Sequence, residues 1–313
     1  MLNIISIKRC MAVAGIALAG LLALPTASAA PWALTGALES HDPSIYKEGS
    51  TWWIFETSTT GIGVKYSPDG LAWTQGGSIF PGGLSWWNAY NGNTTGTWAP
   101  DIHDWNGKAI AYYAVSTFGS QNSAIGLVTA TSIAQGDWVD HGAVITSRTG
   151  DNYNAIDPNF FVDNNGQPWL TFGSWQTGIY TTKVDSTTLM PTGSWYHLAA
   201  DSGGIENSFI MSNGGYYYLF VSKGTCCAGA ASTYRIAYGR STSVTGPYLD
   251  TNGVNMLNGG GNILDAGSAR FIAPGGESVS NGAIVRHELD SENNYIPILF
   301  INDLYFVNGW PSY

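Results

Sequence analysis

Short runs rich in aromatic and β-branched residues recur along the chain, and each follows a turn that carries a glycine. The glycines are Gly49, Gly107, Gly166 and Gly214. The runs that follow them are 52–55, 111–115, 169–172 and 216–221. A glycine turn between two short apolar strands predicts an antiparallel hairpin.

A second pair of strands follows each of these hairpins. The second pairs run from Ile62 to Trp73, from Ile125 to Trp138, from Ile179 to Trp195 and from Tyr234 to Tyr248. The chain is therefore predicted to consist of units with four antiparallel strands each.

The first strand of each unit opens on a similar motif. An acidic residue marks it at Asp42, Asp101, Asp157 and Glu206, at intervals of 59, 56 and 49 residues, and a degenerate fifth copy lies around 267–272. Repeats of roughly 40–50 residues or more, with four strands each, are typical of propeller blades. The sequence thus predicts an all-β fold, a five-bladed β-propeller in a single domain.

In a propeller the first strands line the central axis, so equivalent positions of successive blades converge at one end of it. Asp42, Asp157 and Glu206 are therefore expected to face one another, where burial and like charges drive their pKa values apart. Hydrolysis of a glycosidic bond needs such groups, one carboxylate to deprotonate water and one carboxyl to protonate the leaving oxygen. Asp101 is instead interpreted as a solvated strand end or turn cap.

Residues 1–29 are predicted to be a secretory signal peptide. Lys8-Arg9 precede an apolar run over 11–24, and a small-residue cleavage site follows at 27–29. The alternative, a membrane anchor, lacks a stop-transfer flank. Residues 30–313 are then expected to be the catalytic propeller domain of a secreted, extracellular protein without a membrane partner.

Charge and composition narrow the class of ligand. The full chain has 12 Lys and Arg against 22 Asp and Glu, a formal net charge of −10; without 1–29 it has 10 against 22, or −12. This acidic balance argues against a nucleic-acid partner. With 13 Trp, 17 Tyr and only 11% charged residues, the composition suits a protein that binds neutral sugars, because aromatic rings pack against their C–H surfaces.

Most of the aromatic residues are expected to pack between blades. Trp86, Trp87 and Trp98 are the exceptions that we expect at a ligand site. They lie in or next to the glycine-rich stretch 82–96, which is interpreted as an exposed loop that leads onto an axial strand.

Cysteine is scarce. Cys10 lies in the predicted signal peptide, so the remaining chain keeps only Cys226 and Cys227. As neighbours they cannot link distant segments, and the sequence leaves open a vicinal disulfide or two buried thiols.

Several motifs, weak one by one but specific in this order, resemble family 43 of the glycoside hydrolases, in particular the secreted arabinan endo-1,5-α-L-arabinanases. They span about residues 40–262. The matching stretches begin with His41-Asp42-Pro43-Ser44-Ile45, Trp98-Ala99-Pro100-Asp101-Ile102 and Val115-Ser116-Thr117-Phe118-Gly119-Ser120. They continue with Ser123-Ala124-Ile125-Gly126-Leu127, Asp151-Asn152-Tyr153-Asn154-Ala155-Ile156-Asp157-Pro158-Asn159, Phe172-Gly173-Ser174-Trp175, the run 216–222, Cys226-Cys227 and Gly246-Pro247-Tyr248.

The resemblance implies a five-bladed propeller that cleaves internal α-1,5-L-arabinofuranosidic bonds of arabinan by inverting, single-displacement hydrolysis. By position, Asp42 would be the general base, Glu206 the general acid, and Asp157 the residue that orients the acid and raises its pKa. The resemblance also implies a monomer that requires no cofactor. The residues in the family's substrate-lining segments are His41, Trp98, Phe118, Gly119, Asn154, Ser174 and Trp175.

The chain departs from the family pattern at two places. Asn207-Ser208 stands where Ala-Pro usually follows the acid, which puts a hydrogen-bonding amide beside Glu206. Gly276 stands where many members carry a histidine that faces an ion or a water at the axis. A central Ca²⁺ or other ion would lack this histidine, so no metal ligand is assigned, and the nearby His287 is interpreted as structural.

Two alternatives stay open from the sequence. The first is an exo-acting α-L-arabinofuranosidase or β-xylosidase of the same fold, in which a loop closes the groove to a pocket. The second is a non-catalytic sugar-binding propeller, which is disfavoured because the chain keeps all three carboxylates.

Overall fold

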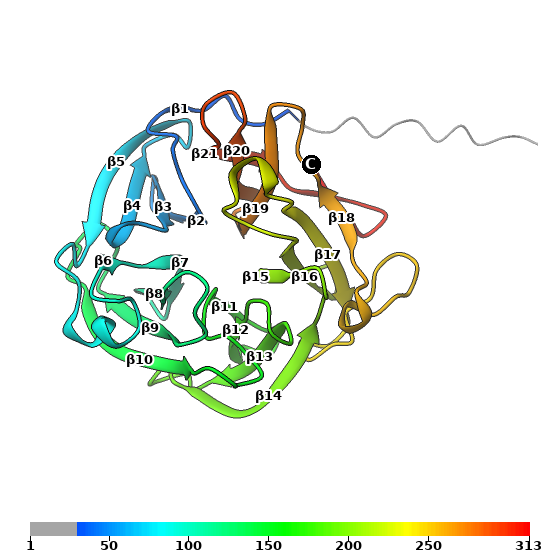
Figure 1. The fold of residues 1–313 in the computed structure, drawn as a ribbon, viewed down its shortest axis with the longest axis horizontal. Coiled ribbons are helices and arrows are strands. Elements are labelled where there is room, and N and C mark those ends of the chain that lie inside the picture. Colours follow the sequence, from blue (N-terminus) through cyan, green and yellow to red (C-terminus); the bar gives the residue numbers. More distant parts are fainter. Residues whose placement is uncertain (1–29) are drawn as a thin grey trace, which may run out of the picture.

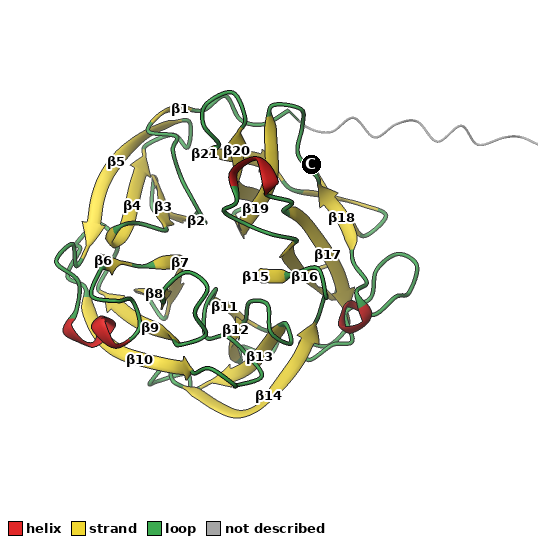
Figure 2. Cartoon of the chain, viewed as in Figure 1, coloured by secondary structure: helices red, strands yellow, loops and turns green. Residues whose placement is uncertain are grey.

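Five antiparallel sheets are arranged around a central axis like the blades of a propeller (Figure 1). The structure is a computed structural model that describes residues 30–313, and the predicted signal peptide lies outside this range. The predicted five-bladed, all-β fold is confirmed. Within the described residues, the only helices are three short 3₁₀ turns (Figure 2), namely η1 (Ser85–Ala89), η2 (Gly229–Ala231) and η3 (Met256–Asn258).

The strands of each blade follow the chain from the axis outward. Blade 1 contains β2 (Ser44–Glu48), β3 (Thr51–Glu56), β4 (Thr60–Ser67) and β5 (Ala72–Ile79), with β1 (Thr35–Gly36) beside β5 and β6 (Thr95–Gly96) beside β4. Blade 2 contains β7 (Trp98–Trp105), β8 (Lys108–Val115), β9 (Ser123–Ala130) and β10 (Val139–Ser147). Blade 3 contains β11 (Asn159–Val162), β12 (Pro168–Phe172), β13 (Ile179–Val184) and β14 (Pro191–Ala199).

Blade 4 contains β15 (Ile205–Asn213), β16 (Tyr216–Lys223), β17 (Arg235–Ser241) and β18 (Asn262–Asp265). Blade 5 contains β19 (Phe271–Ser280), β20 (Ala283–Asp290) and β21 (Ile296–Asp303). The chain ends in a hairpin of β22 (Tyr305–Val307) and β23 (Trp310–Ser312).

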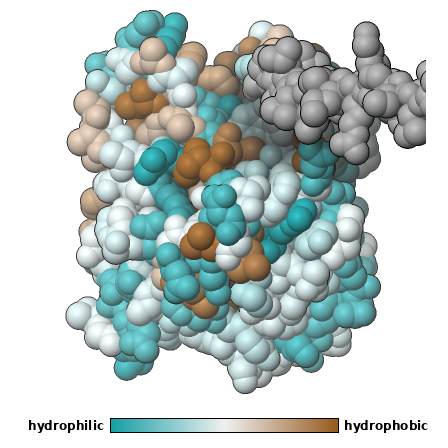
Figure 3. All heavy atoms as spheres, turned by 90° about the vertical axis from the view of Figure 1, so that its right-hand side faces the viewer, coloured by the Kyte–Doolittle hydropathy of each residue, from teal (hydrophilic) through white to brown (hydrophobic). Residues whose placement is uncertain are grey.

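The hydrophobic core lies between the blades because successive side chains of a strand point to opposite faces of its sheet. On β8, Ala111 and Tyr113 pack against blade 1, whereas Ile110 and Tyr112 pack against blade 3. Apolar residues on both faces of a strand therefore belong to a blade that is covered on both sides. The outer side shown in Figure 3 is mostly white and teal, with separate brown groups.

The first strand of each blade enters the axis through a residue with positive φ. These residues are Asp42 (49°), Ala99 (39°), Asp157 (55°), Asn207 (48°) and Ala273 (54°). Non-glycine residues rarely adopt this conformation, and where they do it is often at a functional site. Two of the predicted site carboxylates are themselves such residues.

Asp101, predicted to be a solvated strand end, is instead buried within β7. Its Oδ2 accepts the backbone N–H of Phe160 at 2.6 Å, and its Oδ1 accepts the hydroxyl of Ser44 at 3.2 Å. The prediction is wrong because this carboxylate satisfies buried donors of both neighbouring blades.

The predicted hairpin from Tyr234 to Tyr248 is wrong in its second strand. β17 pairs with β18, and the next residue after Tyr248, Leu249, makes only isolated bridges, with Arg240 and with Asn255. Tyr248 is fully buried between blades 3 and 4, and its hydroxyl donates to the carbonyl of Val244 at 3.0 Å. The ring is therefore part of the core of a long connection.

Candidate active site

A cleft of about 530 Å³ opens at the end of the axis where the first strands begin, and all ten predicted site residues line it. They come from the starts of the axial strands and from loops of blades 1 to 4. The ten are His41, Asp42, Trp98, Phe118, Gly119, Asn154, Asp157, Ser174, Trp175 and Glu206.

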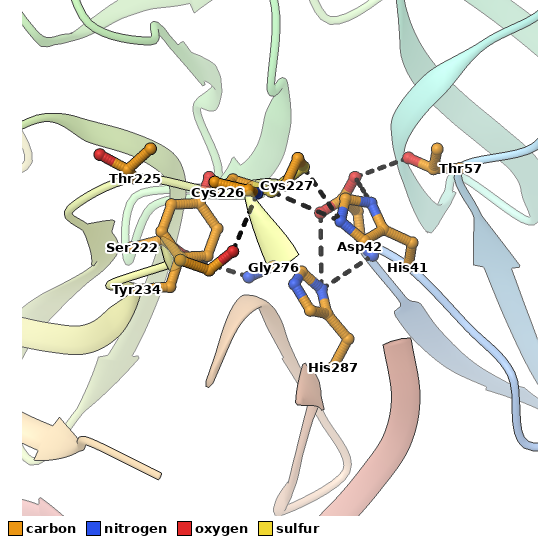
Figure 4. The surroundings of a disulfide bond; sticks show 12 residues. His41, Asp42, Thr57, Ser222, Thr225, Cys226, Cys227, Tyr234, Gly276 and His287 are labelled. Carbon is orange, nitrogen blue, oxygen red and sulfur yellow. Dashed lines mark hydrogen bonds and ion pairs between the residues drawn. A yellow bond between two sulfur atoms is a disulfide. The ribbon is translucent and has the colours of Figure 1, made fainter. Parts of the chain in front are cut away.

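Asp42 is held by three neighbours. Thr57 donates its hydroxyl to Oδ2 at 2.6 Å, and His41 Nδ1 lies 2.8 Å from the same oxygen. The backbone N–H of Asp42 donates to His287 Nδ1 at 3.2 Å (Figure 4). These contacts fix the carboxylate at the mouth of the axis.

The charge of Asp42 follows from these contacts. Burial favours its neutral form, but His41 and the hydrogen bonds outweigh burial and hold the pKa of Asp42 below its ordinary value. Burial likewise disfavours a charged His41, but the Asp42 carboxylate outweighs it and raises the pKa of His41. Burial and the nearby His41 lower the pKa of His287 to about 3, so that ring is neutral. Asp42 is therefore an ionised carboxylate.

Glu206 and Asp157 differ from Asp42 because their pKa values are raised. Burial raises the pKa of Glu206, although hydrogen bonds from Ser174 and Tyr234 oppose the rise. Ser174 donates to Oε2 at 2.5 Å and the Tyr234 hydroxyl donates to Oε1. Burial and the charges of Glu206 and Asp42 raise the pKa of Asp157, whose Oδ2 accepts the backbone N–H of Asn207 at 3.0 Å. The pair thus retains a proton that Asp42 does not.

The rim of the cleft carries exposed aromatic rings. Phe118 is 77% exposed and Trp175 is 42% exposed, and Trp98 is half-buried. Rings that stay exposed beside buried carboxylates provide flat apolar faces for a sugar.

Trp86 and Trp87, which we expected at the ligand site, do not line the cleft. Trp87 is fully buried, and its Nε1 donates to the Tyr113 hydroxyl at 3.1 Å. Trp86 packs on the same cluster and donates to Asp140 at 3.0 Å. The prediction is wrong because η1 folds this part of the glycine-rich stretch onto the core between blades 1 and 2.

Several residues of the site were not predicted. Thr57, Tyr234 and the disulfide Cys226–Cys227 line the cleft, which resolves the alternatives left open for the two cysteines. His287, interpreted as structural, is fully buried against Asp42. It lies on β20, the second strand of its blade, whereas the carboxylates lie at the starts of first strands. The repeat therefore gave no signal for it.

Gly276 has a steric reason to be glycine. A Cβ at this position would lie 2.7 Å from both Asp42 Oδ1 and His287 Nδ1, and its φ is 62°. The imidazole of His287 thus lies where a side chain at 276 would have to begin.

Glu277, the next residue, is a further buried carboxyl that the sequence did not reveal. Its Oε2 accepts the Ser222 hydroxyl at 2.9 Å. Burial raises the pKa of Glu277 to about 8. A second neutral carboxyl therefore lies beneath the cleft at neutral pH.

The candidate ligands for a cation at the axis are His41, Asp42 and His287. His41 Nδ1 and Asp42 Oδ2 are already bonded to each other. His287 Nδ1 accepts a backbone N–H, which places the ring proton on Nε2, so that buried and unpartnered nitrogen offers no lone pair. With no side chain at Gly276, this donor set does not fit a resident metal ion.

Comparisons with known proteins identify the family of this chain. The sequence profile described as "Glycosyl hydrolases family 43" matches residues 35–311. The chain is 49% identical to the extracellular endo-α-(1→5)-L-arabinanase 1 of Bacillus subtilis, over 98% of each chain. It is 36% identical to an extracellular exo-α-(1→5)-L-arabinofuranosidase of Cellvibrio japonicus, over 88% of this chain and 86% of that one. A solved GH43 endo-arabinanase from Bacillus licheniformis superposes with a TM-score of 0.87 at 50% identity, over 90% of this chain and 100% of that one.

Proposed function

The chain belongs to family 43 of the glycosyl hydrolases, and from this premise we propose that it is a secreted endo-1,5-α-L-arabinanase. The observation that carries the proposal is the set of three carboxyls in one cleft, of which Asp42 is ionised while Asp157 and Glu206 together retain a proton. The substrate is arabinan or an arabino-oligosaccharide, as the name of the Bacillus subtilis relative supports.

Each carboxyl has a separate task. Asp42, kept ionised beside His41, takes a proton from a water molecule that attacks the anomeric carbon. Glu206, held by Ser174 and Tyr234, gives its proton to the leaving glycosidic oxygen. Asp157 and Glu206 would repel each other if both were ionised, so the pair keeps one proton at the working pH, and Glu206 can deliver it.

Product analysis tests the substrate and the mode of action. Debranched arabinan, linear xylan and an aryl arabinoside are incubated side by side with the enzyme. Internal cleavage predicts a mixture of arabino-oligosaccharides from arabinan and no products from xylan. Release of arabinose alone from the first turnovers would favour the exo-acting alternative, and binding without products would favour a sugar-binding propeller.

Stereochemistry tests the mechanism. Water attack assisted by Asp42 while Glu206 protonates the leaving group inverts the anomeric centre. Proton NMR of the first-formed product should show the β-configuration, and retention would refute the assignment. Glu206→Ala should slow substrates with poor leaving groups much more than aryl arabinosides, whereas Asp42→Ala should slow both alike.

Three further features complete the proposal. The relative from Bacillus subtilis is named extracellular, and within the described residues no helix has the length and apolarity needed to span a membrane. The protein is proposed to be a monomer, to be checked by light scattering. Hydrolysis uses no resident metal, so dialysis against a chelator should leave kcat/KM unchanged.

A further inference from the structure

The Cys226–Cys227 disulfide lies in the wall of the cleft and touches the partner of the general base (Figure 4). Cys226 Sγ and Cys227 Sγ lie 3.5 Å and 3.6 Å from His41 Nε2. On its other side, His41 Nδ1 lies 2.8 Å from Asp42 Oδ2. The imidazole thus bridges the disulfide and the general base.

Both neighbours of this imidazole can only accept hydrogen bonds. A disulfide sulfur has lone pairs and no hydrogen, and an ionised carboxylate is likewise an acceptor. A neutral His41 carries one N–H and would leave one of the two contacts without a proton. Only the imidazolium form donates on both sides.

The other groups around His41 agree with a positive charge. Glu56, besides Asp42, acts on it as a negative neighbour. His287 stacks on it with ring centroids 4.2 Å apart, and because that ring is neutral it adds no competing charge.

We propose that the Cys226–Cys227 disulfide holds His41 as an imidazolium beside Asp42, and that its reduction by a dithiol removes this charge and reversibly weakens the general base at acidic pH. The proposal rests on the role of Asp42 proposed above. It makes the disulfide a positioning group for the base and a redox-sensitive site within the cleft.

The chemistry of the step balances. A dithiol reductant transfers two electrons and two protons to the disulfide, which becomes two thiols, while the reductant becomes a cyclic disulfide. Cys227 is exposed and Cys226 is half-buried, so a small dithiol has access. A thiol S–H can then donate to His41 Nε2, which turns that nitrogen into an acceptor and favours the neutral ring.

Loss of the neighbouring positive charge acts on Asp42. An opposite charge within about 4–6 Å lowers the pKa of a carboxyl by about 1–3 units, so its removal raises it. The acid limb of kcat/KM should therefore move to higher pH by about one unit or more in the reduced enzyme, while activity near neutral pH changes little.

The experiment compares three samples: the oxidised enzyme, the enzyme treated with dithiothreitol, and the treated enzyme after reoxidation by glutathione disulfide. The two thiols are counted at each stage. The pH profile of kcat/KM on arabinan is one measurement. The titration of His41, followed by NMR of its ring, is the other, and it decides the proposal even if arabinan is not the substrate. Reduction should move the acid limb of kcat/KM to higher pH and the titration of His41 to lower pH, and reoxidation should restore both.

Two matched double variants remove the dependence on reduction. Cys226→Ser/Cys227→Ser offers hydroxyl donors to His41 Nε2 and should behave like the reduced enzyme. Cys226→Ala/Cys227→Ala removes the acceptor without offering a donor, so the pKa of His41 should fall less than in the serine variant, and this variant should not respond to dithiothreitol. If the serine variant and the reduced enzyme keep the His41 titration of the oxidised enzyme, the proposal is wrong.

Discussion

At the residue scale, the site shows how one type of side chain acquires two protonation states within one cleft. Asp42 has a cationic neighbour and two hydrogen-bond donors, so its carboxylate is stabilised. Asp157 is buried beside the carboxyls of Glu206 and Asp42 and has one backbone donor, so its pKa is raised. The difference lies in the partners, since both residues start an axial strand with a positive φ.

Removing the charge of Asp157 should therefore move the pH optimum. In Asp157→Asn the second carboxyl of the coupled pair is gone, so no like charge can form next to Glu206 and the general acid loses its proton at lower pH. The alkaline limb of kcat/KM on linear arabinan should shift to more acidic pH, with a lower maximum. The limb belongs to the coupled pair and not to one residue. An alkaline limb that stays in place while only KM changes would show that Asp157 merely binds substrate.

Glu277 should make stability depend on pH. Its carboxyl ionises near 4.5 in the unfolded chain and at about 8 in the folded protein. Between these values only the folded state holds the proton, so stability falls as pH rises, by at most about 1.4 kcal/mol per pH unit. Glu277→Gln should thus gain stability relative to wild type from pH 5 to pH 8 in urea unfolding. The exposed Glu39→Gln serves as control, and parallel curves for all three proteins would contradict the assignment.

The sequence could predict the three carboxylates because they recur at the same place in successive units. Thr57, Tyr234 and His287 could not be predicted in this way. They lie after a second strand, before a third strand and within a second strand, respectively. Thr57 and Tyr234 contact a carboxyl of their own blade, and His287 contacts Asp42 of the neighbouring blade. Such contacts depend on the three-dimensional packing and leave no period in the sequence.

At the element scale, the hairpins were predictable wherever a glycine turn separates two runs of alternating buried residues. The outer strand of blade 4 was not, because the connection from β17 to β18 places an aromatic residue, Tyr248, in the core without forming a strand. Burial and strand pairing give the same composition signal, so an aromatic residue in a long connection cannot be assigned from sequence alone.

Thr57 joins two of these elements and should be sensitive to loss of its hydroxyl. It donates to Asp42 Oδ2 and accepts the backbone N–H of Ala99 on β7 at 2.9 Å. Thr57→Val leaves that N–H without a partner, which costs about 1–3 kcal/mol of unfolding free energy. It also removes a hydrogen-bond donor to Asp42, which raises the pKa of that carboxyl. The acid limb of the pH profile of kcat/KM should therefore move to higher pH. Thr57→Ser keeps the hydroxyl and should resemble wild type. If Thr57→Val leaves the acid limb unchanged, Thr57 has no effect on the ionisation of Asp42.

At the scale of the whole molecule, the ring is closed by a segment that shows no strand pattern in the sequence. Blade 5 has three strands of its own, and the chain that precedes blade 1 lies along β21. The backbone N–H of Trp32 donates to the carbonyl of Ile301, and that of Leu299 donates to Leu38, both at 2.8 Å. Five units could be counted from the sequence, but the closing segment could not be recognised because its pairing depends on the completed ring.

Trp32→Ala should therefore lower stability without changing catalysis. The indole meets Trp52 edge to face at 5.7 Å and donates to Asp303 at 3.0 Å, so it connects blade 1 with blade 5. Truncating this half-buried ring should cost about 2–4 kcal/mol in urea unfolding and leave kcat/KM at 25 °C unchanged. Phe118→Ala is the matched control, because this exposed ring at the cleft should affect KM and not stability. If Trp32→Ala lowers kcat/KM while its unfolding curve matches wild type, the segment does not close the ring but shapes the site through Asp42, which follows it in the chain.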